Sequence, residues 1–515
     1  MTTRTDASTT IPLLTGELWW GGAVPDGGAM PFGRRPHRRD LAVNAGLVDD
    51  PTAGANQSAP LLLSSAGRAV WSERPFAFGF ADGRLELDTP VELIETGGGL
   101  RDAYLAAARA FFPASGRLPA RELFTAPQYN TWIEMPYRPT QDGVLAYAER
   151  LLAAGFPPGV LMLDDRWSTD YGDWRFDLYR FPDPAAMIGR LHRLGFQVMV
   201  WLVPFLSPDG DPFRELRKAG HLLRGADGEV LIREWWNGFS GLLDLTDPGA
   251  VAWLHARLGE LRELGVDGFK LDAGDLRDYR LDDRPFGGGG PAELCEAFGR
   301  IGLEYPFNEY RACWKLGGQP LAQRLHDKPP TWGADGLLSL IPEGIAQGLI
   351  GHAFTCADMV GGGDVCTLGA GMPVEPEHFV RYTQVAALFP MVQFSISPAR
   401  VLDDEHLALV HAALALRARL LPEIMELAEH AATTGEPIIR PLAYHHPGFE
   451  DVTDQFLLGE DLLVAPVLER GARTRRVVLP PGRWRRIDAG DDVHDAGFLE
   501  LPVTLADQPV FRRER

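Results

Sequence analysis

The feature that most constrains the fold is a unit that repeats between residue 124 and about residue 310. Each unit has an amphipathic helix, then a glycine, then a short apolar strand that ends in charged or aromatic residues. The expected helices are 144–154, 184–194 and 248–264, the strands that follow them are 160–163, 197–204 and 266–271, and a fourth unit ends near 301–302 and leads into 305–311.

Helices that alternate with strands over about 300 residues imply parallel strands joined by right-handed crossovers. Four successive strands that end in charged or aromatic residues favour a closed (β/α)8 TIM barrel over an open doubly wound sheet. No Gly-x-Gly-x-x-Gly follows a strand, and 287–290 is a plain glycine run. We therefore predict a catalytic barrel over residues 123–434, with functional residues at the carboxyl ends of its strands.

Two β-rich segments flank the predicted barrel. Residues 1–122 are rich in Gly, Pro and short β-prone runs and predict an N-terminal β domain, which a helix at 100–112 closes. The pair Trp19-Trp20 either fills this domain or leans over the neighbouring site. Residues 435–515 predict a C-terminal β-sandwich with a turn at 480–482, and 205–243 predicts an inserted loop with strands of its own.

Charge and composition exclude several classes of partner. A net charge of −20 with no Lys/Arg stripe argues against nucleic acid and anionic membranes. The polar N-terminus has no apolar segment typical of a secretory signal, and no stretch is long enough to cross a bilayer. We expect a cytoplasmic protein, a possible homo-oligomer, without a cofactor or metal, because the cysteines lack ligand spacing. These cysteines are Cys295, Cys313, Cys356 and Cys366.

Asp272 is the first candidate for catalysis, because it ends the strand that the third helix leads into. A barrel with strand-end carboxylates and 13 tryptophans suggests sugar chemistry. Retaining glycosidases need one carboxylate as nucleophile and a second carboxyl group as acid. Lys270 lies two residues before Asp272, so Asp272 is expected to stay ionised, which suits a nucleophile. A solvated strand-end aspartate is the alternative at this point.

The run 269–275, Phe-Lys-Leu-Asp-Ala-Gly-Asp, resembles the nucleophile motif of glycoside hydrolase family 31. In this family an arginine precedes the acid/base aspartate, which a tryptophan follows five residues later. Here Arg311 precedes Asp327 by sixteen residues, and Trp332 follows five residues after Asp327. The resemblance implies that Asp272 is the nucleophile and that Asp327 is the acid/base, protonated in a partly desolvated pocket.

The same resemblance implies a set of sugar-binding residues. The segment 164–167, Asp-Asp-Arg-Trp, is similar to the strand end whose first Asp holds distal hydroxyl groups and whose aromatic residue packs on the ring. An acidic residue that binds hydroxyl groups corresponds to Asp358. The expected substrate-binding residues are Asp164, Asp165, Trp167, Trp236, Lys270, Arg311, Trp314 and Asp358.

The segments 128–132, 235–238, 358–362 and 393–398 resemble the branch of the family that includes the myogenesis-regulating glycosidase. That branch implies an exo-acting α-galactosidase that cleaves an α-linked oligosaccharide or glycoside by double displacement. Ser395 departs from the family's α-glucosidases, which have a histidine there, and 328–330, Lys-Pro-Pro, predicts a rigid acid/base loop. An α-glucosidase or α-xylosidase, and a non-catalytic carbohydrate-binding protein, are the alternatives.

Overall fold

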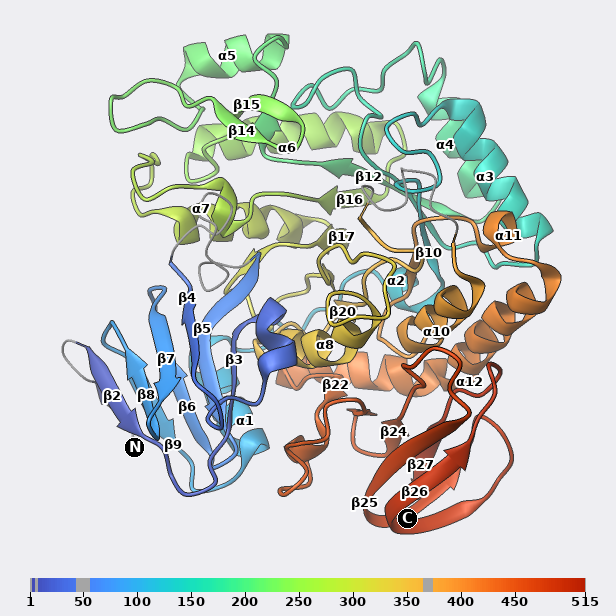
Figure 1. The fold of residues 1–515 in the computed structure, drawn as a ribbon. Coiled ribbons are helices and arrows are strands. Elements are labelled where there is room, and N and C mark those ends of the chain that lie inside the picture. The colour runs from blue at the N-terminus through green and yellow to red at the C-terminus, as the bar shows by residue number, and fades with distance from the viewer. Residues whose placement is uncertain (1, 5–7, 43–55, 365–373, 515) are drawn as a thin grey trace.

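The computed structural model describes residues 2–4, 8–42, 56–364 and 374–514. Cys366, one of the four cysteines considered above, lies outside these residues. Within them the chain forms a central barrel with β-rich segments beside it at both ends of the sequence (Figure 1). Across the described ranges, no helix is both long and apolar enough to span a bilayer.

Eight parallel strands form the barrel, as predicted. Each pairs with the next in the order β21, β10, β11, β12, β16, β17, β19, β20. Single parallel bridges, Cys356 with Met391 and Val360 with Phe394, bring the two ends of this order together and nearly close the barrel. In the same order, the bounds are Gln393–Phe394, Gln128–Asn130, Val160–Leu163, Gln197–Leu202, Gly268–Leu271, Phe307–Tyr310, Gln323–Arg324 and Thr355–Cys356.

Two of the helices that surround the barrel, α4 and α6, begin at the predicted residues, whereas α3 begins at Gln141, three residues before the predicted start. The Asp247 side chain accepts a hydrogen bond from Gly249 N at 2.8 Å, and Pro248 occupies the first turn, so the predicted start of α6 is confirmed. Asp403 caps the longest helix, α12, by accepting from His406 N at 2.9 Å. The helices are α2 (Glu122–Thr125), α3 (Gln141–Ala153), α4 (Pro184–Arg193), α6 (Pro248–Glu263), α7 (Pro291–Ile301), α8 (Leu340–Leu349), α10 (Pro376–Ala386), α11 (Pro398–Val401) and α12 (Asp404–Thr434).

The segment between β12 and α6 folds into a small sheet with a helix. Strand β15 (Gly238–Leu242) pairs antiparallel with β13 (Phe205–Leu206) and with β14 (Arg233–Trp235). Helix α5 (Asp211–Ala219) lies between β13 and β14 in the sequence. The Trp235 ring stacks on Phe205 with ring centroids 4.3 Å apart. Trp235 ends β14 and is buried, whereas Trp236 lies in the turn that follows and is exposed.

Two antiparallel sheets and helix α1 (Leu100–Phe111) form the N-terminal region. Trp19 and Trp20 are buried in this region, so they fill its core and do not lean over the active site. The larger sheet also takes in β18 (Cys313–Trp314) from the barrel region, which pairs parallel with β5. The strands are β1 (Thr2–Arg4), β3 (Trp19–Ala23), β5 (Gln57–Ser64), β6 (Arg68–Trp71) and β9 (Glu92–Glu95) in the first sheet, and β2 (Thr9–Pro12), β4 (His37–Asp40), β7 (Ala77–Ala81) and β8 (Arg84–Leu87) in the second.

The C-terminal region is a β domain with its own apolar core around Trp484 and Phe511. The predicted turn at 480–482 is wrong, because β25 runs through it with a register shift between Leu479 and Arg483. Such a bulge bends a strand without ending it. The order in this sheet is β22 (Ile439–Arg440), β23 (Phe456–Leu458), β24 (Leu462–Val464), β27 (Val510–Glu514), β25 (Thr474–Arg486) and β26 (Val493–Pro502).

Candidate active site

A cavity of about 350 Å³ lies where the barrel strands end. Six of the predicted site carboxylates and cations line it, from within β16 and from the residues after β11, β16, β17 and β19: Asp164, Asp165, Lys270, Asp272, Arg311 and Asp327. In parallel barrels the loops at this end carry the catalytic groups. The lining residues are Trp132, Tyr137, Asp164, Asp165, Trp201, Trp236, Lys270, Asp272, Arg311, Asp327, Met359, Gly363 and Asp364.

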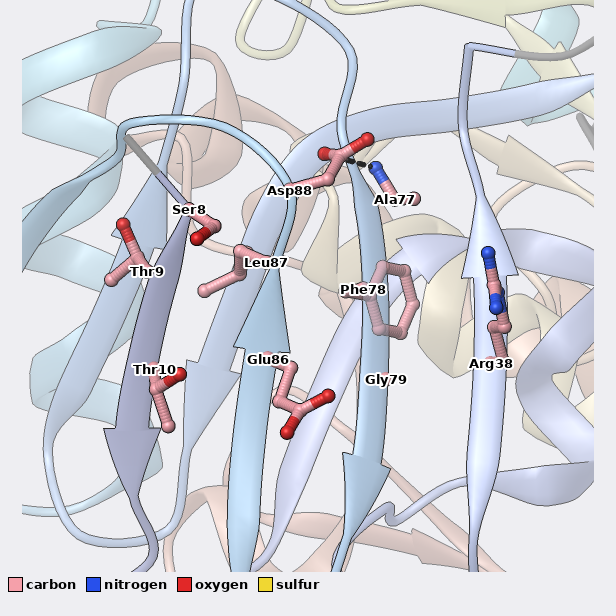
Figure 2. Close-up of a pocket in the computed structure, with 10 residues that line it drawn as sticks. All are labelled: Ser8, Thr9, Thr10, Arg38, Ala77, Phe78, Gly79, Glu86, Leu87 and Asp88. Atoms are coloured by element: carbon pink, nitrogen blue, oxygen red, sulfur yellow. Dashed lines mark hydrogen bonds between the residues drawn. The ribbon is translucent and has the colours of Figure 1, made fainter. Parts of the chain in front are cut away.

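A second, shallower pocket of about 430 Å³ lies on the N-terminal sheet β2-β8-β7-β4 (Figure 2). Thr10, Glu86, Gly79 and Arg38 are paired across its four strands, and the missing side chain at Gly79 leaves the hollow between Glu86 and Arg38. It has carboxylates at Glu86 and Asp88, but Asp88 is already bonded to Ala77 N at 2.8 Å. The barrel cavity is therefore the better candidate for catalysis.

Asp272 is held on both carboxylate oxygens. Its Oδ1 accepts from Arg311 Nε and from its neighbour Ala273 N, each at 2.9 Å, and its Oδ2 accepts from Trp201 Nε1 at 2.8 Å. Burial raises the pKa of Asp272, but the charges of Arg311 and Lys270 outweigh burial and hold the pKa well below its usual range. Asp272 is therefore an oriented, ionised carboxylate, as a nucleophile requires.

Asp327 faces Asp272 across the guanidinium of Arg311. Arg311 Nη1 donates to Asp327 Oδ2 at 3.3 Å, and Arg324 Nη1 donates to Asp327 Oδ1 at 3.0 Å. Burial raises the pKa of Asp327, but the two guanidiniums outweigh it and lower the pKa. The expectation that Asp327 is protonated in the free protein is therefore wrong, because two cations that the sequence pattern did not place together converge on its carboxylate.

Arg311 is the link between the two carboxylates. The same planar group that contacts Asp272 and Asp327 lies under the exposed ring of Trp236, with Arg311 Cζ 5.4 Å from the ring centroid. Trp236 is 43% exposed and lines the cavity, so its face is open to a ligand. An aromatic face beside carboxylates suits a sugar ring, which has apolar faces and polar edges.

Asp164 and Lys270 form a buried ion pair on the opposite wall. Lys270 Nζ donates to Asp164 Oδ2 at 2.6 Å, and Asp165 N donates to Asp164 Oδ1 at 2.9 Å. Burial lowers the pKa of Lys270, but the charges of Asp164, Asp272 and Glu309 together outweigh it and raise the pKa. Both residues line the cavity, so this pair can bind hydroxyl groups without leaving a charge unpaired.

Asp165 is the most incompletely paired carboxylate of the cavity. Its Oδ2 accepts from Asn237 Nδ2 at 2.8 Å and from Tyr171 OH at 3.2 Å, whereas its buried Oδ1 has no hydrogen-bond partner among the described residues. Burial, with the charge of Asp164, raises the pKa of Asp165 to about 6. Asp165 can therefore accept a hydrogen bond from a ligand, or donate one when protonated.

Comparison with known proteins agrees with this geometry. The model for the TIM-barrel domain of glycosyl hydrolases family 31 matches residues 124–290, and the model for the C-terminal domain of the same family matches 435–515. The myogenesis-regulating glycosidase of Mus musculus is 36% identical over 422 residues, 78% of this chain and 57% of that protein. The chain belongs to glycoside hydrolase family 31.

Other members of family 31 match along most of the chain. Alpha-xylosidase XylQ of Lactiplantibacillus pentosus is 26% identical over 411 residues, 73% of this chain and 52% of that protein. The structure of the Flavobacterium johnsoniae family 31 dextranase complexed with glucose superposes with a TM-score of 0.84 at 21% identity, covering 98% of this chain and 66% of that one. The chain spans 52% and 57% of the length of these two curated relatives.

Three residues that the family 31 resemblance proposed for sugar binding do not line the cavity. Trp167 is fully buried against Trp174 and Phe176, and its Nε1 donates to Trp201 O at 2.6 Å. Trp314 lies in β18, at the edge of the N-terminal sheet. The third is Asp358. Trp167 and Trp314 therefore support the walls from behind instead of packing on a sugar ring.

Asp358 is completely buried behind the floor of the cavity. Its Oδ1 accepts from Arg324 Nη1 at 2.5 Å and its Oδ2 accepts from Lys328 N at 2.7 Å. Burial is the main cause that raises the pKa of Asp358 to about 7. Asp358 therefore orients Arg324, which contacts the acid/base candidate, and it does not face a sugar hydroxyl.

Six residues that line the cavity were not among the predicted site residues, and the sequence marks some of them more clearly than others. Trp201 lies in β12, inside the predicted strand 197–204, and could have been proposed on that position. Trp132 lies in one of the family-like segments quoted above. Met359 also lies in one of these segments, whereas Tyr137, Gly363 and Asp364 lie in loops outside them, where the pattern of the sequence does not define the direction of a side chain. Ser395 donates to Gly362 O at 2.8 Å and does not line the cavity.

No group of three or more His, Cys, Asp or Glu residues within the described ranges could hold a metal ion. The cations at the cavity are instead side chains, Lys270 and Arg311, and both are paired with carboxylates.

Proposed function

We propose that this chain is a retaining, exo-acting α-glycoside hydrolase that works through a covalent glycosyl-aspartate. The observation that carries the proposal is the single guanidinium of Arg311, which contacts Asp272 at 2.9 Å and Asp327 at 3.3 Å in one cavity. Retaining enzymes place their two carboxyl groups closer together than inverting enzymes, which must fit a water between them. Two carboxylates within reach of one guanidinium support the retaining arrangement.

In the first step Asp272 attacks the anomeric carbon. A bond forms between a carboxylate oxygen of Asp272 and that carbon, the bond to the leaving oxygen breaks, and Asp327 gives its proton to that oxygen. Trp201 and Ala273 hold the Asp272 carboxylate in place through hydrogen bonds at 2.8 and 2.9 Å. The developing positive charge on the sugar is stabilised by the ionised Asp272.

Asp327 must gain a proton before that step, although Arg311 and Arg324 lower its pKa in the free protein. A sugar bound between Asp272 and Asp327 would exclude water and displace the 3.3 Å contact from Arg311. Both changes raise the pKa of a carboxyl group. We therefore place the acid form of Asp327 in the substrate complex.

In the second step a water molecule releases the sugar. Asp327, now ionised, takes a proton from water, the water oxygen bonds to the anomeric carbon, and the bond to Asp272 breaks. Once Asp272 is esterified its charge is gone, so Arg311 can turn its charge entirely toward Asp327. Loss of the Asp272 charge, which raises the pKa of Asp327 in the free protein, together with the charge of Arg311, lowers the pKa of Asp327 and leaves it ionised to act as a base.

For the substrate we propose a neutral α-galactoside. Support comes from the 36% identity to the myogenesis-regulating glycosidase, whose branch implied this activity, and from Ser395, which stands where α-glucosidases of the family have a histidine. Lys270 and Arg311 are both engaged by carboxylates, so the described walls offer no unpaired cation to an anionic sugar. The 26% identity to an α-xylosidase favours an α-xyloside as the second candidate.

The cytoplasm is the compartment we propose. Three cysteines, Cys295, Cys313 and Cys356, are buried and free in the structure, which supports a reducing environment.

The test is hydrolysis of nitrophenyl α-galactoside, α-glucoside and α-xyloside by the wild type, by Asp272→Ala and Asp327→Ala, and by Asp282→Ala as control. Asp282 is exposed in the loop after the nucleophile strand. We expect cleavage of the α-galactoside, with net retention by NMR, and loss of at least about 10³-fold in Asp272→Ala. Preference for another α-glycoside contradicts the substrate, activity surviving in Asp272→Ala contradicts the mechanism, and binding without turnover favours the carbohydrate-binding alternative.

A further inference from the structure

Gly363 lies closer to Asp327, the acid/base candidate, than a residue with a side chain could lie. A Cβ built on Gly363 would lie 2.6 Å from Asp327 Oδ1 and 2.8 Å from Asp327 Cβ and Cγ. Carbon atoms of side chains do not approach other atoms so closely, so a residue with a side chain here would have to move Asp327. Gly363 also lines the cavity.

The requirement for glycine is steric and not conformational. Gly361 and Gly362, just before it, have positive φ angles of 99° and 87°, which glycine adopts without strain. Gly363 has no such angle among the backbone features of the described residues. The close approach to Asp327 is thus the reason for glycine at this position.

Asp327 has little freedom to move away. Arg324, itself fully buried, holds Asp327 Oδ1 at 3.0 Å, and Arg311 holds Oδ2 at 3.3 Å. A short side chain with both oxygens bonded cannot yield to a new methyl group without losing one of these contacts. Crowding at Gly363 would therefore change the position of the carboxyl group and its pKa together.

Backbone hydrogen bonds hold Gly363 itself at this place. Its N donates to the carbonyl of Lys328, the residue after Asp327, at 3.2 Å, and its own carbonyl accepts from Trp132 Nε1 at 2.7 Å. Lys328 N in turn donates to Asp358 Oδ2 at 2.7 Å. The residue after Asp327 is thus tied through its carbonyl to Gly363 and through its N–H to Asp358, in the segment that leads to Gly363.

From these contacts we infer that Gly363 is a positioning residue for Asp327, and that its lack of a side chain sets the direction in which the acid/base donates its proton. The inference rests on the proposed glycosidase function. Loss of the glycine should therefore slow the step in which Asp327 donates a proton to the leaving oxygen.

The experiment compares two substrates with Gly363→Ala. A methoxyphenyl α-galactoside has a poor leaving group and needs the acid, whereas a dinitrophenyl α-galactoside leaves with little help. We expect kcat/KM to fall by about 10²-fold or more for the first and by less than about 10-fold for the second, because general acid catalysis contributes about 10² to 10⁴. kcat/KM reports the first step only, so the later role of Asp327 as a base does not affect it.

The matched control is Gly259→Ala, since a Cβ at Gly259 in α6 meets nothing within 4 Å. It should leave both substrates unchanged. Trp132→Phe removes the bond to the Gly363 carbonyl without adding bulk, and a smaller loss with the same dependence on the leaving group is expected. Equal losses for the two substrates in Gly363→Ala would overturn the inference.

A crystal structure of Gly363→Ala separates this inference from the proposed function. The inference requires Asp327 Oδ1 to leave its 3.0 Å contact with Arg324 or Oδ2 to leave Arg311. A variant in which both contacts persist would overturn the inference whatever the activity of the wild type. A displaced Asp327 in a protein that cleaves no α-glycoside would support the inference about position and reject the proposed function.

Discussion

Arg311 Nε donates to Asp272 Oδ1 at 2.9 Å while the same guanidinium reaches the second carboxylate of the cavity. The charge of Arg311 lowers the pKa of both Asp272 and Asp327. One side chain therefore sets the ionisation of both groups, and its replacement should affect both limbs of a pH–rate profile.

Arg311→Lys should move the whole profile toward higher pH. A lysine presents one compact charge and cannot contact both carboxylates as the planar guanidinium does. Weaker stabilisation of the anions raises both pKa values, so the acid limb, where Asp272 is protonated, and the basic limb, where Asp327 loses its proton, both shift upward. kcat/KM should fall by about 10²-fold at the optimum. Arg300→Lys, in an exposed ion pair, is the control, and unmoved limbs in Arg311→Lys would reject the assignment.

Lys270→Met should destabilise the protein by about 3–5 kcal/mol, because it leaves the buried Asp164 carboxylate without its cation at 2.6 Å. Adding Asp164→Asn removes the unpaired charge and should restore part of the loss. The free energy of unfolding is measured in urea for both single variants and the double variant. Lys218→Met, at an exposed position, is the control, and additive effects of the two changes would show that the pair is not coupled.

Asp278→Asn should stabilise the protein at neutral pH and not at pH 4. Burial, and then the neighbouring Asp275, raise the pKa of Asp278 to about 7 in the folded protein. The protonated side chain therefore contributes its full share of stability below the pKa that Asp278 has in the unfolded chain, and this contribution is lost as the pH rises toward 7. The amide keeps an acceptor for Asp275 N, now bonded to Asp278 Oδ2 at 3.0 Å. We expect a gain of the order of 2 kcal/mol at pH 8.

The measurement is the melting temperature of wild type and Asp278→Asn between pH 4 and pH 8. Asp282→Asn, exposed in the same loop, should show no pH-dependent difference. If the melting temperatures of wild type and Asp278→Asn differ by the same amount at pH 4 and pH 8, the pKa of Asp278 is not raised.

Trp236→Ala should raise KM for a glycoside by about 10-fold and change kcat little. The ring is 43% exposed and lines the cavity above Arg311, so it offers a face for packing rather than a reacting group. Phe286→Ala removes an aromatic side chain that is 71% exposed and does not line the cavity, and it should leave KM unchanged. A large fall in kcat with unchanged KM would show instead that Trp236 acts by holding Arg311.

Much of the site could be predicted because it follows local rules. Lys270 and Asp272 are two residues apart across the end of one strand, so they point to the same side, and the structure places both at the cavity. Asp164 and Asp165 directly follow the end of β11, and both line the cavity. The motifs around Asp327 and Arg311 located those residues without any knowledge of their surroundings.

Trp314 shows where local rules end. Its two-residue strand pairs with β5, more than 250 residues earlier in the chain, and this pairing turns the side chain away from the cavity. Trp167 and Asp358 were likewise proposed from motif position, but packing against Trp174 and bonds to Arg324 hold them behind the walls. Long-range packing sets the positions of all three side chains, and the spacing of residues in the sequence does not reveal such packing.

By itself, the sequence determined the parallel barrel, the strand-end positions of the carboxylates and the family, because helix and strand periods and short motifs are local properties of the chain. Only the tertiary structure decided which tryptophans face the cavity and that Asp327 is ionised in the free protein. The physical reason is that burial and electrostatic interaction depend on distance in space, and Asp327 is reached by Arg311, which follows β17, and by Arg324, which lies in β19.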